Sequence, residues 1–162
     1  KNLDFIHSSF TNFSMFANLT YIYSKVSLQG SAPTSRPLQG QSPYLLNIGL
    51  QYNSKKGGWA GSLLYNRIGQ RLALVGITDL GFADVYERPR DQADFQLSKK
   101  IMKEKGELKL TWADILNPAY YFYENIDTKK AYSGSNDRLF NSYRPGSTIT
   151  IGFTYDFSLG KK

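Results

Sequence analysis

Apolar and polar residues alternate with a period of two along most of this chain. The pattern is clearest near the C-terminus, where the apolar positions are Ile149, Ile151, Phe153, Tyr155 and Phe157. The residues between them are mostly polar or small: Thr150, Gly152, Thr154 and Asp156. Successive side chains of a β-strand point to opposite faces, so the pattern predicts a strand with one apolar and one polar face.

The same alternation predicts five further strands and the end of a seventh. They cover residues 13–23, 44–53, 59–68, 94–101 and 108–113, and the incomplete strand ends at residue 5. Some apolar residues fall on the polar side of their strands: Phe16, Ile22, Leu45, Leu64 and Ile68. Helical periodicity is weak almost everywhere, so we expect an all-β, antiparallel fold.

Short and long connections alternate strictly along the chain. The short ones cover residues 7–12, 54–58 and 102–106, and the long ones cover 29–43, 69–90 and 117–146. An up-and-down barrel of the outer membrane has short periplasmic turns and long extracellular loops, whereas a soluble sandwich has no reason to sort its loops by length. Predicted strands of about ten residues, with Tyr and Trp near their ends, also suit a transmembrane barrel.

Composition agrees with this interpretation. Aromatic residues make up 15% of the chain, with 12 Tyr and 10 Phe, and such a count fits the aromatic girdles of a barrel. Charged residues make up 20% and mean hydropathy is −0.42, so a helical membrane protein is excluded. The net charge is +7, but the lysines gather at segment ends rather than in one stripe, so no nucleic-acid partner is expected.

Four segments resemble, in the same order, segments near the end of TonB-dependent receptor barrels of Bacteroidota. They are RPLQGQSPYLLNIGL at residues 36–50, DVYERPRDQ at 84–92, DILNP at 114–118 and RPG at 144–146. Their order is more specific than any one of them, and the resemblance covers nearly the whole chain. The sequence is similar to the C-terminal part of such a receptor, of the SusC-like or a related type.

The resemblance implies an antiparallel transmembrane barrel of 22 strands in the full protein, with residues 1–162 supplying its last six to seven strands. It also implies an N-terminal plug, coupling to TonB through the missing N-terminal part, and import of a scarce nutrient across the outer membrane. Expected partners are outer-membrane lipid and lipopolysaccharide, the remainder of the barrel with its plug, and a surface lipoprotein. Two alternatives stay open: a small eight-stranded barrel acting as an anchor or adhesin, and a soluble β-sandwich binding module.

No catalytic constellation stands out, so we expect neither an enzyme nor a cofactor or metal site. The one histidine, His7, is predicted in a turn. Four acidic residues lie in or beside one long loop, where solvated carboxylates are a better interpretation than a cation site: Asp79, Asp84, Glu87 and Asp91.

Aromatic residues at an extracellular mouth can stack on flat ligands. The predicted loop contacts with a ligand or partner are Tyr120, Tyr121, Phe122, Tyr123, Arg88 and Arg90. The alternative is that these tyrosines extend the final hairpin and pack against neighbouring loops. In the closing strand, Phe153, Tyr155 and Phe157 resemble the signal that the outer-membrane assembly machinery reads.

The alternation also assigns the two faces of the barrel wall. Lipid-facing positions are predicted to include Leu46, Ile48, Leu50, Ile149, Ile151 and Phe153. Lumen-facing positions are predicted to include Asn47, Gln51, Thr150 and Thr154.

Overall fold

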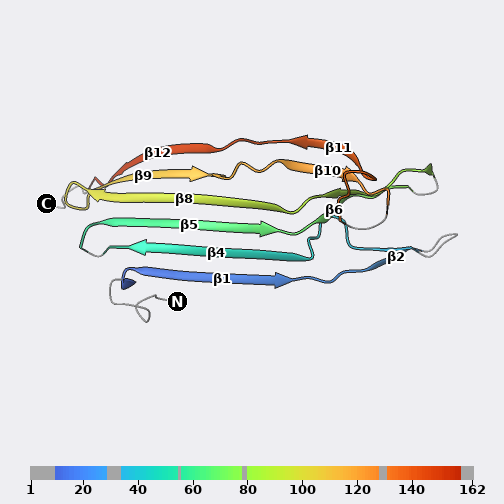
Figure 1. Cartoon of the computed structure of the whole chain (residues 1–162). Helices are drawn as coiled ribbons and strands as arrows, with labels where there is room; N and C mark the ends of the chain where they lie inside the picture. Colours follow the sequence, from blue (N-terminus) through green and yellow to red (C-terminus); the bar gives the residue numbers. More distant parts are fainter. Residues whose placement is uncertain (1–9, 29–33, 55, 78–79, 128–130, 158–162) are drawn as a thin grey trace.

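A computed structural model describes residues 10–28, 34–54, 56–77, 80–127 and 131–157. These residues form twelve β-strands in three antiparallel sheets (Figure 1). The predicted strand end at residue 5 and His7 lie outside the described residues. Among the residues described, no helix is long and apolar enough to cross a membrane.

The six long strands form one sheet, called here the main sheet, in the order β1-β4-β5-β8-β9-β12. Their bounds are β1 Phe13–Tyr21, β4 Tyr44–Asn53, β5 Trp59–Ile68, β8 Arg90–Ile101, β9 Gly106–Ala113 and β12 Thr148–Tyr155. All six were predicted, and β4 and β5 have the predicted bounds. The turns β4–β5 and β8–β9 lie at one end of the sheet, the turn end, and the long connections lie at the other, the loop end (Figure 1).

Strand pairing places the apolar residues on one face of the main sheet. Residues opposite one another on antiparallel strands share a face. One row crosses all six strands with apolar side chains alone: Met15, Leu50, Leu63, Phe95, Trp112 and Ile149. The neighbouring row, on the other face, is wholly polar: Ser14, Gln51, Ser62, Gln96, Thr111 and Thr150. The main sheet therefore has the two chemically different faces that the sequence predicts.

The apolar exceptions to the alternation gather on the polar face. Phe16 pairs with Gly49, which pairs with Leu64, and Leu45 pairs with Ile68. The Phe16 ring lies directly over Gly49, because a Cβ at that glycine would come within 2.1 Å of the ring. The glycine thus makes room for an aromatic ring on a surface that is otherwise polar.

The long connections contain short strands that the alternation did not predict. The strands β6 (Arg71–Leu74), β7 (Val85–Glu87), β10 (Tyr120–Glu124) and β11 (Arg138–Tyr143) form a second sheet, called here the distal sheet. Its order β6-β7-β10-β11 repeats the order β5-β8-β9-β12 of the strands that each one extends. The main sheet brings these segments side by side, and their Val, Tyr and Phe residues favour extended backbone.

The first long connection forms a two-stranded ribbon of its own. Its strands are β2 (Val26–Leu28) and β3 (Thr34–Arg36), which extend β1 and β4 beyond the loop end. Hydrogen bonds tie the connection to β6, since the Gly40 amide donates to the Leu72 carbonyl over 2.8 Å. An ion pair of 2.8 Å joins Arg36 to Asp84, so ribbon and distal sheet are fixed to one another.

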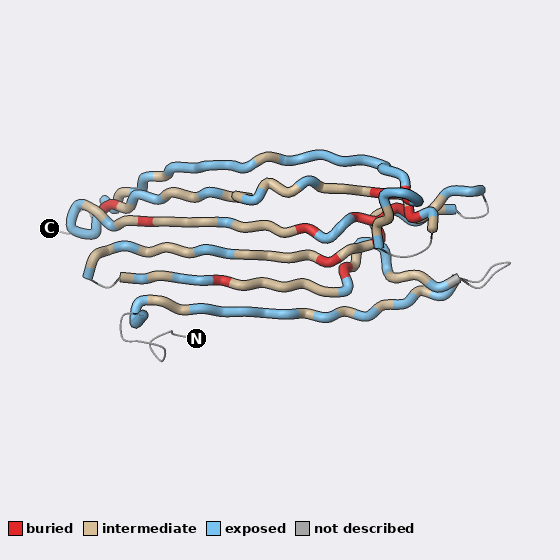
Figure 2. The backbone as a smooth tube through the Cα atoms, viewed as in Figure 1, coloured by how far each residue is buried: buried red, intermediate tan, exposed pale blue. Residues whose placement is uncertain are grey.

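Buried residues gather where the main sheet meets the distal sheet (Figure 2). The buried apolar residues of the described part are Leu72, Val85, Tyr86 and Tyr123, all in the distal sheet. Strands of the main sheet are largely exposed or half-buried on both faces. The core of the described chain therefore lies in the distal sheet, and both faces of the main sheet remain available for contacts with other molecules or other parts of the protein.

The contact between Phe16 and Gly49 gives a testable prediction about the polar face. We expect Gly49→Ala to lower the free energy of unfolding by about 1–2 kcal/mol, because the new methyl group must displace the Phe16 ring. Urea unfolding of the complete protein in detergent measures the change. Gly152→Ala is the matched control, since a Cβ at this glycine of the same face meets nothing within 4 Å. Equal losses in the two variants would contradict the prediction.

Candidate functional site

Five of the six residues predicted to contact a ligand lie in strands. Tyr120, Tyr121, Phe122 and Tyr123 belong to β10, which pairs with β7 on one side and β11 on the other. Arg88 lies just after β7, and its amide donates to the Tyr121 carbonyl over 2.9 Å. Pairing on both sides fixes which way each side chain points, so the six residues divide between two faces.

Tyr121, Tyr123 and Arg88 belong to the covered face of the distal sheet. The Tyr123 ring is fully buried and stacks on Tyr86 with ring centroids 6.2 Å apart. The Arg88 guanidinium lies over Tyr121 and Tyr132, at 5.2 and 4.9 Å from their ring centroids. These contacts stabilise the sheet itself, and the buried Tyr123 ring presents no surface to a ligand.

Burial changes the chemistry of this tyrosine cluster. Loss of solvent raises the pKa of Tyr123, and the nearby Asp137 carboxylate raises it further. Burial also raises the pKa of Tyr86. The hydrogen bond between the hydroxyls of Tyr121 and Tyr132, 3.1 Å apart, raises the pKa of Tyr121. All three shifts favour the neutral form of the ring.

Tyr120, Phe122 and Arg90 lie on the opposite, open face of the distal sheet. The Tyr143 ring stacks nearly parallel to Tyr120 and Phe122, with centroid distances of 5.0 and 6.2 Å. The Arg90 guanidinium lies over the Tyr120 ring at 4.0 Å. Three aromatic rings and one arginine thus form a continuous platform across β10, β11 and the start of β8.

A charged cluster adjoins the platform. The Glu87 carboxylate lies 2.6 Å from Arg71 and 3.4 Å from Arg90, and it is almost fully buried. Arg90 is 8% exposed, and its Nε and Nη1 atoms donate no hydrogen bond within the described chain. Two guanidinium groups against one carboxylate leave one net positive charge. Because Arg90 is also on the polar face of the main sheet, opposite Ile68, the open face continues that polar face.

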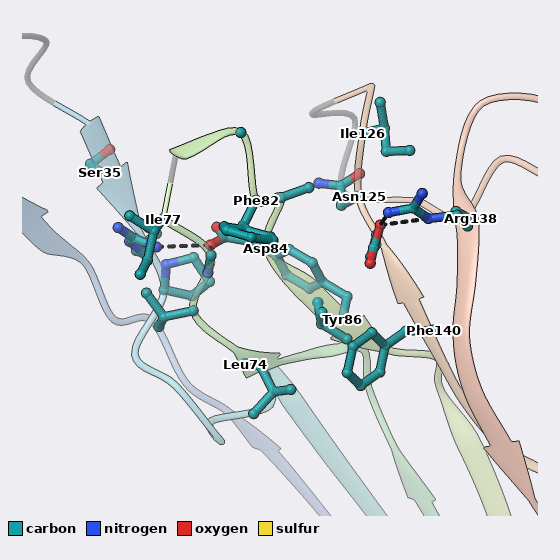
Figure 3. Close-up of a pocket in the computed structure, with 18 residues that line it drawn as sticks. Ser35, Leu74, Ile77, Phe82, Asp84, Tyr86, Asn125, Ile126, Arg138 and Phe140 are labelled. Carbon is teal, nitrogen blue, oxygen red and sulfur yellow. Dashed lines mark hydrogen bonds and ion pairs between the residues drawn. The ribbon is translucent and has the colours of Figure 1, made fainter. Parts of the chain in front are cut away.

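A hollow of about 820 Å³ lies beyond the platform, at the far end of the distal sheet (Figure 3). One of its walls is a cross-strand row of the open face: Leu74, Val85, Glu124 and Arg138. Arg138 Nε donates to Glu124 over 2.9 Å, and the Arg36–Asp84 ion pair lies on the other side of the hollow (Figure 3).

The sequence did not identify this hollow, although it contained one signal. The apolar run at residues 72–77 is unusual for a loop, and Leu74, Val75 and Ile77 line the hollow. Phe140, Asn125 and Ile126 also line it, and nothing in their spacing singled them out. Their convergence requires the pairing of β10 with β11.

Three of the four acidic residues weighed as a cation site are neutralised by arginine. Asp84 pairs with Arg36, Glu87 with Arg71 and Arg90, and Asp91 with Arg67. Asp79 lies outside the described residues. Within the described chain, no group of three His, Cys, Asp or Glu side chains could hold a metal ion.

The residues of the predicted assembly signal lie on the last strand and just after it. β12 is an edge strand of the main sheet, and among the described residues it pairs only with β9. Phe153 and Tyr155 are on the apolar face, opposite Leu108 and Gly106. The Phe157 ring packs edge-on against Tyr155, with centroids 4.7 Å apart.

The buried tyrosines give a prediction about pH. The folded-state pKa of Tyr123 lies above the unfolded value of about 10, so the unfolded chain loses this proton first as pH rises. Thermal stability of the distal sheet should therefore be unaffected by this group below about pH 10 and fall above it. Thermal unfolding followed by tyrosine fluorescence across that range measures the decline.

Tyr123→Phe should make the decline above pH 10 less steep, because it removes this proton linkage. Tyr143→Phe is the matched control, since it makes the same substitution at a ring that is exposed on the open face. An equally steep decline in Tyr123→Phe would refute the assignment.

Comparison with known proteins identifies the family of this chain. The family model described as "Outer membrane protein beta-barrel family" matches residues 2–155, which is nearly the whole chain. No curated protein and no solved structure matches it.

Proposed function

Because this chain belongs to the outer membrane protein β-barrel family and is located in the outer membrane, we propose that it is part of a TonB-dependent transporter. In this proposal, the main sheet is part of the barrel wall, and the distal sheet is part of the extracellular mouth. The complete protein, of the Bacteroidota receptor type, takes up a scarce nutrient and has no enzymatic activity.

The two faces of the main sheet support the assignment of a wall. The apolar face suits lipid and the polar face suits a lumen, as in other transmembrane barrels. Aromatic rings flank the apolar face at both ends, with Tyr21 and Tyr44 at the loop end and Tyr52 and Trp59 at the turn end. Such rings favour the two membrane interfaces.

One ion pair on the apolar face also lies near the loop end. Arg67 donates to both carboxylate oxygens of Asp91, over 2.7 and 2.8 Å, and Tyr65 donates to the same carboxylate over 2.6 Å. Arg67 pairs with Leu46, and this is the pair just before Leu45 and Ile68, with which β5 ends. At this level the charges face lipid headgroups rather than hydrocarbon.

The edges of the main sheet support a larger barrel. Within the described chain, β1 pairs only with β4 and β12 pairs only with β9. An unpaired edge in lipid would leave backbone N–H and C=O groups unsatisfied, which costs several kcal/mol for each group. We propose that further strands, 22 in all, close the barrel, and that a plug from the same polypeptide lies against the polar face.

The observation that carries the transport proposal is the open face of the distal sheet. It continues the polar wall past the loop end and adds the stacked rings of Tyr120, Phe122 and Tyr143, with the buried Arg90 guanidinium over Tyr120. Stacked aromatic rings suit a binding mouth. The same rim would meet lipopolysaccharide and a surface lipoprotein, and TonB would act through the earlier part of the polypeptide. A simple anchor has no use for such a surface.

The wall assignment is tested by placing an arginine on each face of the main sheet and comparing the two losses of stability. We expect Ile151→Arg to destabilise the folded barrel by about 2–4 kcal/mol, since an arginine near the bilayer midplane lacks solvation. Thr150→Arg, one residue earlier and on the polar face, should cost far less. The stability of the two variants is compared by folding them into lipid vesicles at increasing urea and detecting the folded form by its heat-modifiable migration. A larger loss in Thr150→Arg would reverse the assignment of the faces.

Transport is tested with the native protein and its host. We expect the polypeptide extracted in detergent to have a mass on the order of 100 kDa, as a plugged barrel requires. Loss of the protein and loss of TonB should each abolish growth on the same limiting nutrient.

A native mass near 18.4 kDa, with heat-modifiable migration, would refute the transporter and favour the small barrel that serves as an anchor or adhesin. Growth that depends on the protein but not on TonB would refute the energy coupling alone.

A further inference from the structure

The described residues that line the hollow at the end of the distal sheet carry no net charge. Its charged side chains form two internal ion pairs, Arg36 with Asp84 and Arg138 with Glu124. Each charge is met within the wall, so the hollow offers no uncompensated charge to an ion. A fitting ligand is neutral, or carries both signs.

Most of the remaining lining is apolar, and six of these side chains are exposed. Leu74, Phe82, Ile126 and Phe140 are each about half exposed or more, with Phe140 at 51%. Figure 3 shows Phe82 and Phe140 on different sides of the space, with Leu74 below. Oligosaccharide sites rely on flat aromatic faces and many polar groups, whereas branched aliphatic side chains fit the aliphatic groups of a ligand.

One polar group in this wall lacks a partner. Asn125 is 9% exposed, and its side-chain Oδ1 accepts no hydrogen bond within the described chain. Figure 3 shows it between Phe82 and Ile126. An unsatisfied buried carbonyl costs about 1–3 kcal/mol, and a ligand that donates to it recovers that cost. This oxygen is closed to solvent, so its contact with a ligand requires a rotation about the soft terminal torsion of Asn.

These features describe the chemistry of a peptide. A side-chain amide offers an acceptor beside its donors, and a peptide bond offers the complementary donor and acceptor. Aliphatic side chains of a peptide fit among Leu74, Ile126 and Phe140, and its charged termini can approach the two ion pairs. Within a cavity of about 820 Å³, a few residues of extended chain can be accommodated.

We propose that this hollow binds short peptides with aliphatic side chains, and that such peptides are the cargo. The inference rests on the proposed transport function, because it names the substrate class of that mouth. Asn125 hydrogen-bonds the peptide backbone, and Phe140 contacts an aliphatic side chain.

The test uses the complete protein in detergent and a pool of tetrapeptides composed of Gly, Ala, Val and Leu. Retention of the pool is measured by ultrafiltration and mass spectrometry, beside a Gly/Ser tetrapeptide pool and maltotetraose. Phe140→Ser should weaken binding of the aliphatic pool about tenfold, because it removes a large apolar contact.

Leu139→Ser is the matched control, since Leu139 precedes Phe140 in β11, is equally exposed at 49%, and does not line the hollow. It should change binding less than about twofold, because Leu139 does not line the hollow. Absence of binding, equal effects of the two variants, or binding of maltotetraose that depends on Phe140 would overturn the peptide assignment.

Uptake measured in parallel separates this inference from the proposed function. If TonB-dependent uptake of another nutrient persists while the aliphatic pool does not bind, the peptide assignment fails and the transporter stands. If the pool binds through Phe140 but its uptake does not require TonB, the binding site stands and the proposed energy coupling fails.

Discussion

The unbroken pairing of the main sheet is the constraint on which the rest of the structure depends. Its five strand pairs keep a constant register without a bulge. A slip of one residue in any pair would move that strand's apolar side chains to the polar face. Constant register also aligns the strand ends, and this alignment places the second and third long connections side by side so that they can pair again in the distal sheet.

The sequence predicted the long strands because their signal is local. Residues 44–53 and 59–68 alternate with three exceptions, Leu45, Leu64 and Ile68, and pairing required no correction of their ends. The short strands escaped prediction because β7 has three residues and β6 has four, too few for a period to show. Their extended shape comes from pairing with neighbouring strands of the distal sheet, which the main sheet brings close, and tertiary pairing of this kind cannot be read from a window of sequence.

In the candidate site too, some features follow from local sequence and others depend on strand pairing. The aromatic residues of β10 were found by composition, yet their separation onto two faces follows from pairing with β7 and β11. Arg90 was singled out, whereas its neighbours Glu87, Arg71 and Tyr143 were not grouped with it. Sequence reveals which side chains can recognise a ligand, but only the register reveals which of them share a surface.

The two faces of β10 separate recognition from stability within one short strand. Tyr123 holds the core on the covered face, and Tyr120 and Phe122 belong to the platform on the open face. Substitutions at alternate positions therefore act on different properties of the protein. A lineage can change what the mouth recognises by altering every second residue, while the residues between them preserve the scaffold, so this strand is well suited to rapid evolutionary change in specificity.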